Sequence, residues 1–395
     1  MSAWGMRDFR FLWGGRAISL LGSWLLVVAV PAHVYALTGS VFATGLTLAA
    51  EYLPALLLGP IAGVLVDRWD RRRVMIVADL FRAGAVAAML IGTPAAIYVA
   101  VIAESVGAVL FRPAAQAHVP AVVGTGERLT SANSWNAATD GVVRLIGPPL
   151  GGVLLVWAGF EVLICLDVAS YLVSAAAIAL TRRRKAIRQE RVTFDFKVFK
   201  QLKLARVLLP LSGVFLLANA ALSALLVPFG VRNLGGSAQV GFVLSALGIG
   251  FLGGAVLARW LGRIQLRTAL AAAQLATAGG FAVLFSAHDL TTAMIAATVI
   301  GMFGSVTVVA PQTALQRVAD NAHLGRISAA FLVVEAFATL TGALAGPWLA
   351  ESASLHFAAM TAAAITAIGA LAAAVTVPRV MLATKRSNEQ VDAHA

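Results

Sequence analysis

The chain has 395 residues, of which 60% are hydrophobic and only 12% are charged, about half of the ~25% usual for soluble domains. This composition would fill about twelve membrane-spanning helices of ~20 residues each, so it excludes a soluble two-domain enzyme, a disordered chain, a collagen-like chain and a nucleic-acid-binding protein. The formal net charge of +12 comes from basic residues between apolar runs, which is not a nucleic-acid-binding pattern. The single cysteine, Cys165, allows no intramolecular disulfide.

Apolar runs separated by breakers predict twelve spans. Their expected ranges are 11–37, 43–66, 74–92, 95–113, 133–156, 159–181, 206–230, 238–258, 267–286, 290–311, 326–349 and 355–377. The first run is too long for the apolar region of a signal peptide. An even number of spans places both termini on the same side.

The loops on one side of these spans are rich in arginine and lysine. They carry Arg68, Arg71, Arg72, Arg73, Arg112, Arg128, Arg182, Arg183, Arg184, Lys185, Arg259, Arg263, Arg267, Arg317 and Arg326. The opposite loops are short and carry Arg232. Because basic loops stay in the cytoplasm, we expect a multi-pass protein of the bacterial cytoplasmic membrane with both termini cytoplasmic.

The longest polar segment runs from Thr181 to Arg206, in the middle of the chain. After its basic cluster it alternates apolar and basic residues, namely Phe194, Phe196, Lys197, Phe199, Lys200, Leu202 and Lys203. This pattern predicts an amphipathic helix at the membrane surface, with a solvated linker as the alternative. The predicted organisation is a half over 1–181, a linker over 182–205, a second half over 206–378 and a cytoplasmic tail over 379–395.

The two halves repeat each other. Segments 30–40 and 227–237 share six of eleven residues at an offset of 197. Further pairs follow in the same order: Gly63, Arg68 and Trp69 with Gly254, Arg259 and Trp260; Pro113 and Arg128 with Pro311 and Arg326; Gly147 and Pro148 with Gly346 and Pro347. We therefore expect an all-α membrane protein with twelve transmembrane helices in two pseudo-symmetric six-helix halves, as in transporters built from parallel repeats.

Two motifs connect this pattern to a known family. Residues 59–73, GPIAGVLVDRWDRRR, resemble the signature loop between spans two and three of the major facilitator superfamily, with Asp70 in place of the usual glycine. Residues 147–152, GPPLGG, are similar to the C-terminal half of that superfamily's antiporter motif. The stretch between Phe111 and Ser134 resembles the drug:proton antiporter branch that includes macrolide-efflux and enterobactin-exporter proteins.

This resemblance implies roles for both motifs. It implies a cytoplasmic gating motif that latches the halves when the protein is open outward, formed by Gly63, Asp67, Arg68, Arg71, Arg72 and Arg112. Simple anchoring by positive charge is the alternative for the arginines. It also implies an antiporter-type helix bend at Gly147, Pro148, Gly151 and Gly152, where a proline removes a helix hydrogen bond. Ordinary packing, with Gly147 and Gly151 spaced for close helix contact, is the alternative for these residues.

Ionisable side chains inside spans are costly and therefore functional candidates. The proton-coupling candidates are Glu104, Glu335, Glu51, Asp140 and Arg144. Asp140 and Arg144 are four residues apart, so a simple pair along one helix face is the alternative for them. Asp79 and Arg82 are expected to belong to the loop cluster at the start of span three.

The sequence says less about substrate contacts. Candidates in spans expected near a central cavity are Trp24, Trp135, Asn136, Asn219 and Phe303, with Phe42 and Phe215 also considered; packing is the alternative for each. A cavity of apolar walls with a few acids suits hydrophobic small molecules.

The predicted function is proton-coupled efflux of hydrophobic small molecules or drugs by alternating access. A dedicated siderophore or metabolite exporter, or a symporter, of the same fold is the first alternative, and a non-transporting membrane sensor or binding protein is the second. No Walker motif, metal-ligand cluster or catalytic set is evident in the sequence, so we expect no enzyme and no cofactor besides the proton gradient. Expected partners are a hydrophobic substrate, protons and lipids but no nucleic acid, and we expect a monomer.

Overall fold

The computed structural model describes residues 3–66, 69–124, 126–182, 203–261, 264–318 and 321–378. The first half contains α1 (Arg7–Thr38), α2 (Val41–Val66), α3 (Arg71–Ala87), α4 (Pro94–Val123), α5 (Glu127–Ala158) and α6 (Phe160–Ala179), with short 3-10 helices at Ala3–Gly5 and Ala88–Ile91. The second half contains α8 (Lys203–Asn233), α9 (Ser237–Leu261), α10 (Leu266–Phe285), α11 (Leu290–Val318), α12 (Asn321–Ser352) and α13 (Leu355–Thr376).

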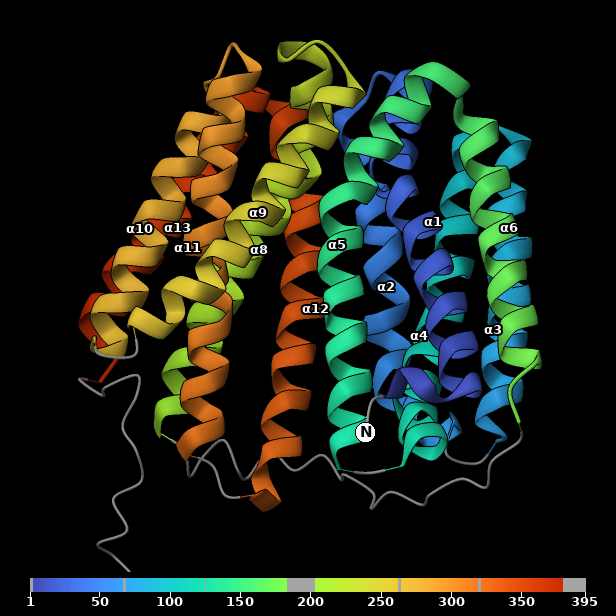
Figure 1. Ribbon diagram of the computed structural model, residues 1–395. Coiled ribbons are helices and arrows are strands. Elements are labelled where there is room, and N and C mark those ends of the chain that lie inside the picture. The colour runs from blue at the N-terminus through green and yellow to red at the C-terminus, as the bar shows by residue number, and fades with distance from the viewer. Residues whose placement is uncertain are drawn as a thin grey trace, which may run out of the picture.

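The predicted all-helical fold with twelve spans is confirmed. In the part of the chain that the structure describes, twelve helices are long and apolar enough to cross a membrane. Helices satisfy every interior backbone group within themselves, which a segment surrounded by hydrocarbon requires. The helices run side by side, with the first half on the right of Figure 1, the second half on the left, and α5 and α12 between them.

Two spans extend further than the sequence predicted. The ends expected at Pro113 and Pro311 are wrong, because α4 continues to Val123 and α11 to Val318. An internal proline removes only one helix hydrogen bond, and α4 is held along its length by α2 and α3. The actual end of α4 is Gly124, which adopts φ 78° and donates its N–H to the Pro120 carbonyl.

The turns between helices are defined by capping residues. Gly39 closes α1 with φ 65°, and Asp70 accepts a hydrogen bond from the Arg73 N–H (3.1 Å) at the start of α3. Thr93 and Ser354 cap α4 and α13 in the same way. Asp70 therefore has a local structural role at the position where the family pattern has glycine, because a side-chain oxygen satisfies a free N–H of the first helical turn.

The two halves have matching internal packing. Helix α1 packs against α5 and α6, and its counterpart α8 packs against α12 and α13. The halves meet through α5 with α9 and through α12 with α2. We call the face where α1 begins, lower in Figure 1, the terminal face, and the other the opposite face.

Glycines of the repeated segments allow the closest helix contacts. A Cβ added at Gly147 would lie 2.5 Å from the Cβ of Trp24, and one at Gly151 would lie 2.2 Å from the Leu25 carbonyl oxygen, so α5 touches the surface of α1 at both positions. In the second half Gly346 meets Ala221 in the same manner. Gly346 is the repeat partner of Gly147 at an offset of 199, and Ala221 is the repeat partner of Trp24 at an offset of 197. The repeated glycine therefore preserves the same helix–helix contact in both halves.

The Gly151 contact predicts a large effect for a small substitution. Gly151→Ala should destabilise the protein by about 1–3 kcal/mol, because the methyl group would overlap the α1 backbone, which has no rotamer change to offer. Thermal unfolding of the detergent-purified protein measures this loss. Gly84→Ala is the matched control, since a Cβ on that α3 residue meets nothing within 4 Å. Equal melting temperatures for the two variants would contradict the contact.

Candidate functional site

The halves are closed against each other at the opposite face by two equivalent seams. In the α2–α12 seam, a Cβ on Gly45 would lie 2.3 Å from the Pro347 side chain. In the α5–α9 seam, a Cβ on Gly241 would lie 2.5 Å from the Pro148 carbonyl oxygen. Pro148 and Pro347 are repeat partners, so each seam places a glycine of one half against the repeated proline of the other.

The antiporter-like motif contacts two different helices from two separate faces of α5. Gly147 and Gly151 pack against α1 of the same half, whereas Pro148 and Gly152 contact α9 of the other half. A Cβ on Gly152 would lie 2.5 Å from the Ser237 carbonyl oxygen. The close helix contact expected for the two glycines is present.

Polar contacts reinforce the α2–α12 seam. Glu351 Oε1 accepts hydrogen bonds from Ser40 Oγ and from the Phe42 N–H (3.1 Å), so a carboxylate of the second half caps the first turn of α2 in the first half. Alongside, Arg232 donates to the hydroxyl of Tyr35. We call these five residues the cross-half clasp. A carboxylate at a helix N-terminus is stabilised by the free N–H groups there.

The burial of α5 decreases toward the terminal face. Most buried residues of α5 are concentrated in its second half, at Val143, Gly147, Pro148, Gly151 and Gly152. In its first half Ala132 is buried, but Asn133, Ser134 and Trp135, which follow it, are all exposed. Helix α5 is therefore covered mainly near the opposite face.

Charged side chains from both halves interact with one another where α2, α4, α5 and α12 lie. Glu335 of α12 interacts electrostatically with Arg112 of α4 and Arg144 of α5, and all three side chains are exposed although they lie inside spans. Glu51 of α2 interacts with Arg112, and Tyr52 next to it interacts with Glu335. Four helices thus contribute to one group of charges, which we call the central charge group: Glu51, Tyr52, Arg112, Arg144 and Glu335.

An aromatic ring flanks this group. The Arg144 guanidinium lies 5.5 Å from the centre of the Trp24 ring, a cation–π distance. Trp24 is half-buried and is held by the close contact of Gly147 with its Cβ. Two acids, two arginines and two aromatic side chains therefore belong to one site shared by the two halves. The sequence predicts Trp24 as a substrate contact and Glu51, Glu335 and Arg144 as proton-coupling residues, whereas it assigns Arg112 to the gating motif.

Glu104 belongs to a different, intra-half cluster. Its Oε1 accepts hydrogen bonds from Arg82 Nε (2.8 Å) and from the Tyr171 hydroxyl (2.8 Å), and Arg82 Nη2 lies 2.6 Å from it. Arg82 also lies 3.5 Å from Asp79. The expectation that Asp79 and Arg82 belong to the loop cluster is therefore wrong, because α3 carries them far enough into the bundle to face α4 and α6.

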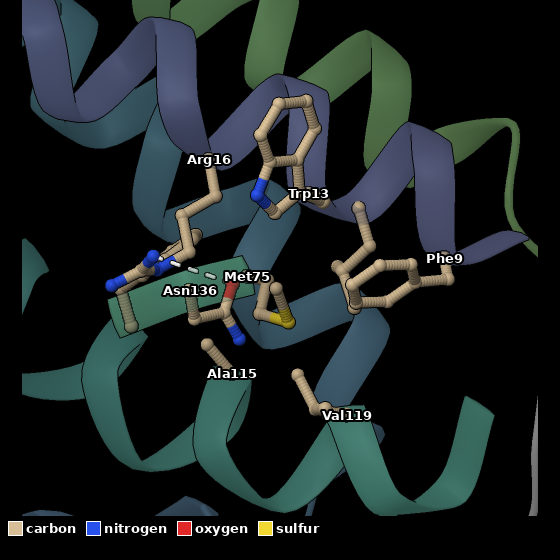
Figure 2. A pocket seen from close by; sticks show the side chains of 9 residues that line it. Phe9, Trp13, Arg16, Met75, Ala115, Val119 and Asn136 are labelled. Carbon is tan, nitrogen blue, oxygen red and sulfur yellow. Dashed lines mark hydrogen bonds between the residues drawn. The ribbon is translucent and has the colours of Figure 1, made fainter. Parts of the chain in front are cut away.

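The expected pair of Asp140 with Arg144 is also corrected. Asp140 instead accepts two hydrogen bonds from Arg16 Nη2 of α1, at 2.7 and 3.0 Å. Arg16 Nη1 donates to Asn136 as well (3.4 Å), as the dashed line in Figure 2 shows. Asp140 therefore pairs with an arginine of a neighbouring helix through charge-assisted hydrogen bonds from a single guanidinium nitrogen.

Figure 2 shows a small pocket next to this ion pair, inside the first half. Its lining is mostly apolar and comes from α1, α3, α4 and α5, with Phe9, Met75 and Val119 around it. Trp135 lies nearby in a cluster of rings, 4.8 Å from Trp4 and 5.9 Å from Trp13. These contacts place Trp135 and Asn136 in the packing of α1 against α5.

The remaining substrate candidates lie in more ordinary surroundings. Phe303 packs against the apolar core of the second half, and Phe215 is buried. Asn219 is half-buried, and its carbonyl accepts a hydrogen bond from Ser223. The backbone N–H of Phe42 belongs to the cross-half clasp.

The gating motif is described only in part. Asp67 and Arg68 lie outside the described residues, as do the surroundings of Gly63. Arg71 Nη1 donates to the Ala117 carbonyl (3.0 Å), and Arg72 donates to the Ile178 (3.1 Å) and Ala179 carbonyls at the end of α6. These bonds tie α3 to α4 and α6 within the first half, since cations are favourable at a helix C-terminus.

Several residues of the site were missed or misplaced by sequence reasoning. Glu351, Tyr171 and Arg82 acquire their partners from helices that are distant in the chain. Arg82 had a usable signal, because it is the twelfth residue of α3 (Arg71–Ala87) and an arginine that deep in a span requires a carboxylate partner. The sequence carries no signal for the role of Glu351, since an acidic residue near a helix end is common.

The fold and the site together define a membrane protein of two six-helix halves that share a group of charged side chains. Residues 12–331 and 211–395 match the family model described as Major Facilitator Superfamily. The chain therefore belongs to the major facilitator superfamily.

Among sequence relatives, macrolide efflux protein A of Streptococcus pyogenes is 29% identical over 181 residues, which cover 44% of this chain and 44% of that protein. The match thus spans less than half of that relative's length. The multidrug efflux pump Tap of Mycolicibacterium fortuitum is 27% identical over 85% of this chain and 87% of the pump. A putative bacilysin exporter of Bacillus subtilis is 27% identical over 64% of this chain and 66% of the exporter.

Solved structures agree on the fold. A bacterial homologue of the human lysosomal transporter Spinster, in an inward-facing and occupied conformation, superposes with a TM-score of 0.77 at 12% identity, covering 94% of this chain and 96% of the homologue. A bacterial homologue of the iron transporter ferroportin, in its inward-facing state, gives 0.75 at 15% identity, covering 93% and 99%.

The cross-half clasp predicts a shift in the balance between closed and open states of the opposite face. Glu351→Gln should favour the open state about fivefold, because loss of a helix cap costs about 1 kcal/mol. Spin labels at Leu37 and Asn233, exposed positions at the ends of α1 and α8, report the separation by pulsed electron resonance once Cys165 is replaced by serine.

The control is Glu161→Gln, which neutralises another exposed acid, in the first turn of α6. It should leave the distance distribution as in the parent protein. Identical distributions for Glu351→Gln and the parent would show that the clasp does not hold this face closed.

Proposed function

We propose that this protein exports hydrophobic small molecules across the bacterial cytoplasmic membrane in exchange for protons. The observation that carries the proposal is a group of ionisable and aromatic side chains from both halves, together with two seams that close the opposite face. We infer that these side chains line a transport cavity open to the terminal face. The printed names of the relatives, a multidrug efflux pump among them, support export as the direction of transport.

Orientation follows from the distribution of basic residues. With the arginine-rich loops in the cytoplasm, both termini and the terminal face are cytoplasmic, and the described conformation is open inward. The protein then takes substrate from the cytoplasm or the inner leaflet and releases it after the clasp opens. We propose that it acts as a monomer, with the proton gradient as its energy source and no further cofactor.

The balance of charges in the central charge group favours one class of substrate. Arg112 and Arg144 are balanced by Glu51 and Glu335 in the central charge group. A cavity of balanced charge beside the aromatic face of Trp24 suits a neutral or amphipathic molecule better than a multiply charged anion. This favours a drug-like substrate over the siderophore alternative.

We assign the proton step to Glu335. This residue interacts electrostatically with Arg112 and Arg144 and lies on α12, the helix that also carries the clasp residue Glu351. We propose that Glu335 gives up a proton to the cytoplasm and takes one from the outside, whereas Glu104 is ion-paired with Arg82 in the described conformation. The gating motif around Asp67 remains, on this proposal, the latch of the outward-open state, so Asp67→Asn should be expressed normally and slow transport.

Inverted membrane vesicles with an acid interior test the proposal. A quenched pH dye should brighten when a substrate enters the vesicles in exchange for protons, and empty vesicles should show no change. The panel consists of macrolides, lipophilic cations and siderophores. Binding to the purified protein without any effect on the gradient would sink proton exchange and leave uniport, symport with another ion or a sensor.

A variant separates coupling from binding. Glu335→Gln should lower substrate-dependent proton release about tenfold, or about 1.4 kcal/mol in barrier terms, because the amide exchanges no proton. Asp289→Asn, on a loop outside the spans, is the control and should transport like the parent protein. Unchanged proton release by Glu335→Gln would remove Glu335 from the proton step.

A further inference from the structure

The first half encloses a second group of ionisable residues, away from the central charge group. Asp79 and Arg82 come from α3, Glu104 from α4, and Asp167 and Tyr171 from α6. Asp79 and Tyr171 have no exposed surface, and Asp167 is only 1% exposed. The cluster therefore lies in the protein interior, between helices of one half.

Glycines allow the helices to close over these groups. A Cβ on Gly22 of α1 would lie 2.3 Å from the Asp167 carboxylate, and one on Gly107 of α4 would lie 2.4 Å from the Arg82 side chain. The Ser23 hydroxyl of α1 lies 2.8 Å from the Tyr171 hydroxyl. Helix α1 thus contributes a bare backbone and a hydroxyl to the cluster.

The charges in this enclosure do not balance if every acid is ionised. Asp79 interacts with Arg82 and Glu104, and Asp167 interacts with Glu104, Arg82 and Asp79. Three carboxylates would therefore face one guanidinium, and Tyr171 is a neutral phenol. The guanidinium is already engaged by Glu104 at 2.6 Å, whereas its distance to Asp79 is 3.5 Å. Buried charges without a partner are very costly.

Hydrogen bonding within the cluster indicates what is missing. Both carboxyl oxygens of Asp79 are buried and lack a hydrogen bond of ordinary geometry among the described residues; the Ser174 hydroxyl of α6 and the Arg82 guanidinium, 3.5 Å away, interact with this carboxyl group as weaker donors. Asp167 has the Ser170 hydroxyl at 3.0 Å, but that hydroxyl also lies 2.7 Å from a backbone carbonyl, and a hydroxyl has one proton to donate. Protonation gives each aspartate an O–H that donates to a neighbouring hydroxyl oxygen, that of Ser174 for Asp79 and that of Ser170 for Asp167, so each group gains a hydrogen bond.

We propose that this enclosure is a proton-binding site in which Asp79 and Asp167 are both protonated in the described conformation, while Glu104 and Arg82 form its ion pair. Two bound protons make the cluster neutral. Glu104 connects it with the cavity, because its side chain is 19% exposed and it interacts with Glu51. On release, an aspartate O–H bond breaks, the proton passes to Glu104 and then to cavity water, and the new carboxylate remains beside Arg82.

This inference deepens the proposed function, since it names a store of protons next to the transport cavity. Its test needs no substrate. Infrared spectroscopy of the full chain in lipid nanodiscs detects the C=O stretch of protonated carboxyl groups, which shifts in heavy water. At neutral pH the parent protein should show signals of which Asp79→Asn and Asp167→Asn each remove one, and the double variant should lack both of these.

Asp289→Asn is the matched control. The backbone N–H of Thr292 donates a hydrogen bond to Asp289 and lowers the pKa of this loop carboxyl below its ordinary value, so it is ionised at neutral pH and should contribute no signal. Arg82→Gln provides a second arm if an aspartate variant does not fold. Loss of the guanidinium should leave Glu104 protonated too and add a signal.

The proposal is overturned if the double variant keeps the signals of the parent protein, or if Arg82→Gln leaves them unchanged. These outcomes are separate from those of the vesicle experiment. Infrared signals that vanish in the double variant, together with vesicles that move no protons, would keep the site and reject proton-coupled export. Absent signals with active proton exchange would reject the site and keep the export mechanism.

Discussion

The whole arrangement depends on how closely helices can approach where glycine exposes the backbone. Gly147 and Gly151 bring α5 onto α1, Gly45 and Gly241 close the two seams, and Gly22 lets α1 cover a carboxylate. In a bilayer the lipid tails are as apolar as leucine, so helix association relies on such close packing and on polar contacts. The contacts between the two halves at Gly45, Gly152 and Gly241 are concentrated toward the opposite face.

The fold could be predicted almost completely, and the site only in part. The number of helices and the division into two halves can be predicted from local sequence features, namely the lengths of the apolar runs and the repeat of segments 30–40 and 227–237. The partners of charged residues are not local: Asp140 had a plausible partner four residues away in Arg144, yet Arg16 binds it from another helix. Such pairings depend on how the helices pack against one another, and the spacing of residues along one helix does not predict that packing.

The repeat has diverged where the chemistry differs. Ser40 and Ser237 are equivalent, but Ser40 meets the carboxylate of Glu351 whereas Ser237 meets Gly152. Tyr35 and Arg232 are also equivalent at the offset of 197, and they bond to each other across the approximate twofold axis. The first half additionally buries its acid cluster. Similar backbones therefore support a polar seam, a close-packed seam and one half specialised for charge.

The difference between the two seams has a consequence for the evolution of the gene. Each seam joins a residue of one repeat to a residue of the other, so a duplicated half is never free to change alone. A change at Glu351 alters the surroundings of Ser40, which lies 311 positions earlier. The two halves are thus bound to coevolve as partners, although they arose as copies, and swapping halves between distant members of the family would preserve each bundle while mismatching the surface they share.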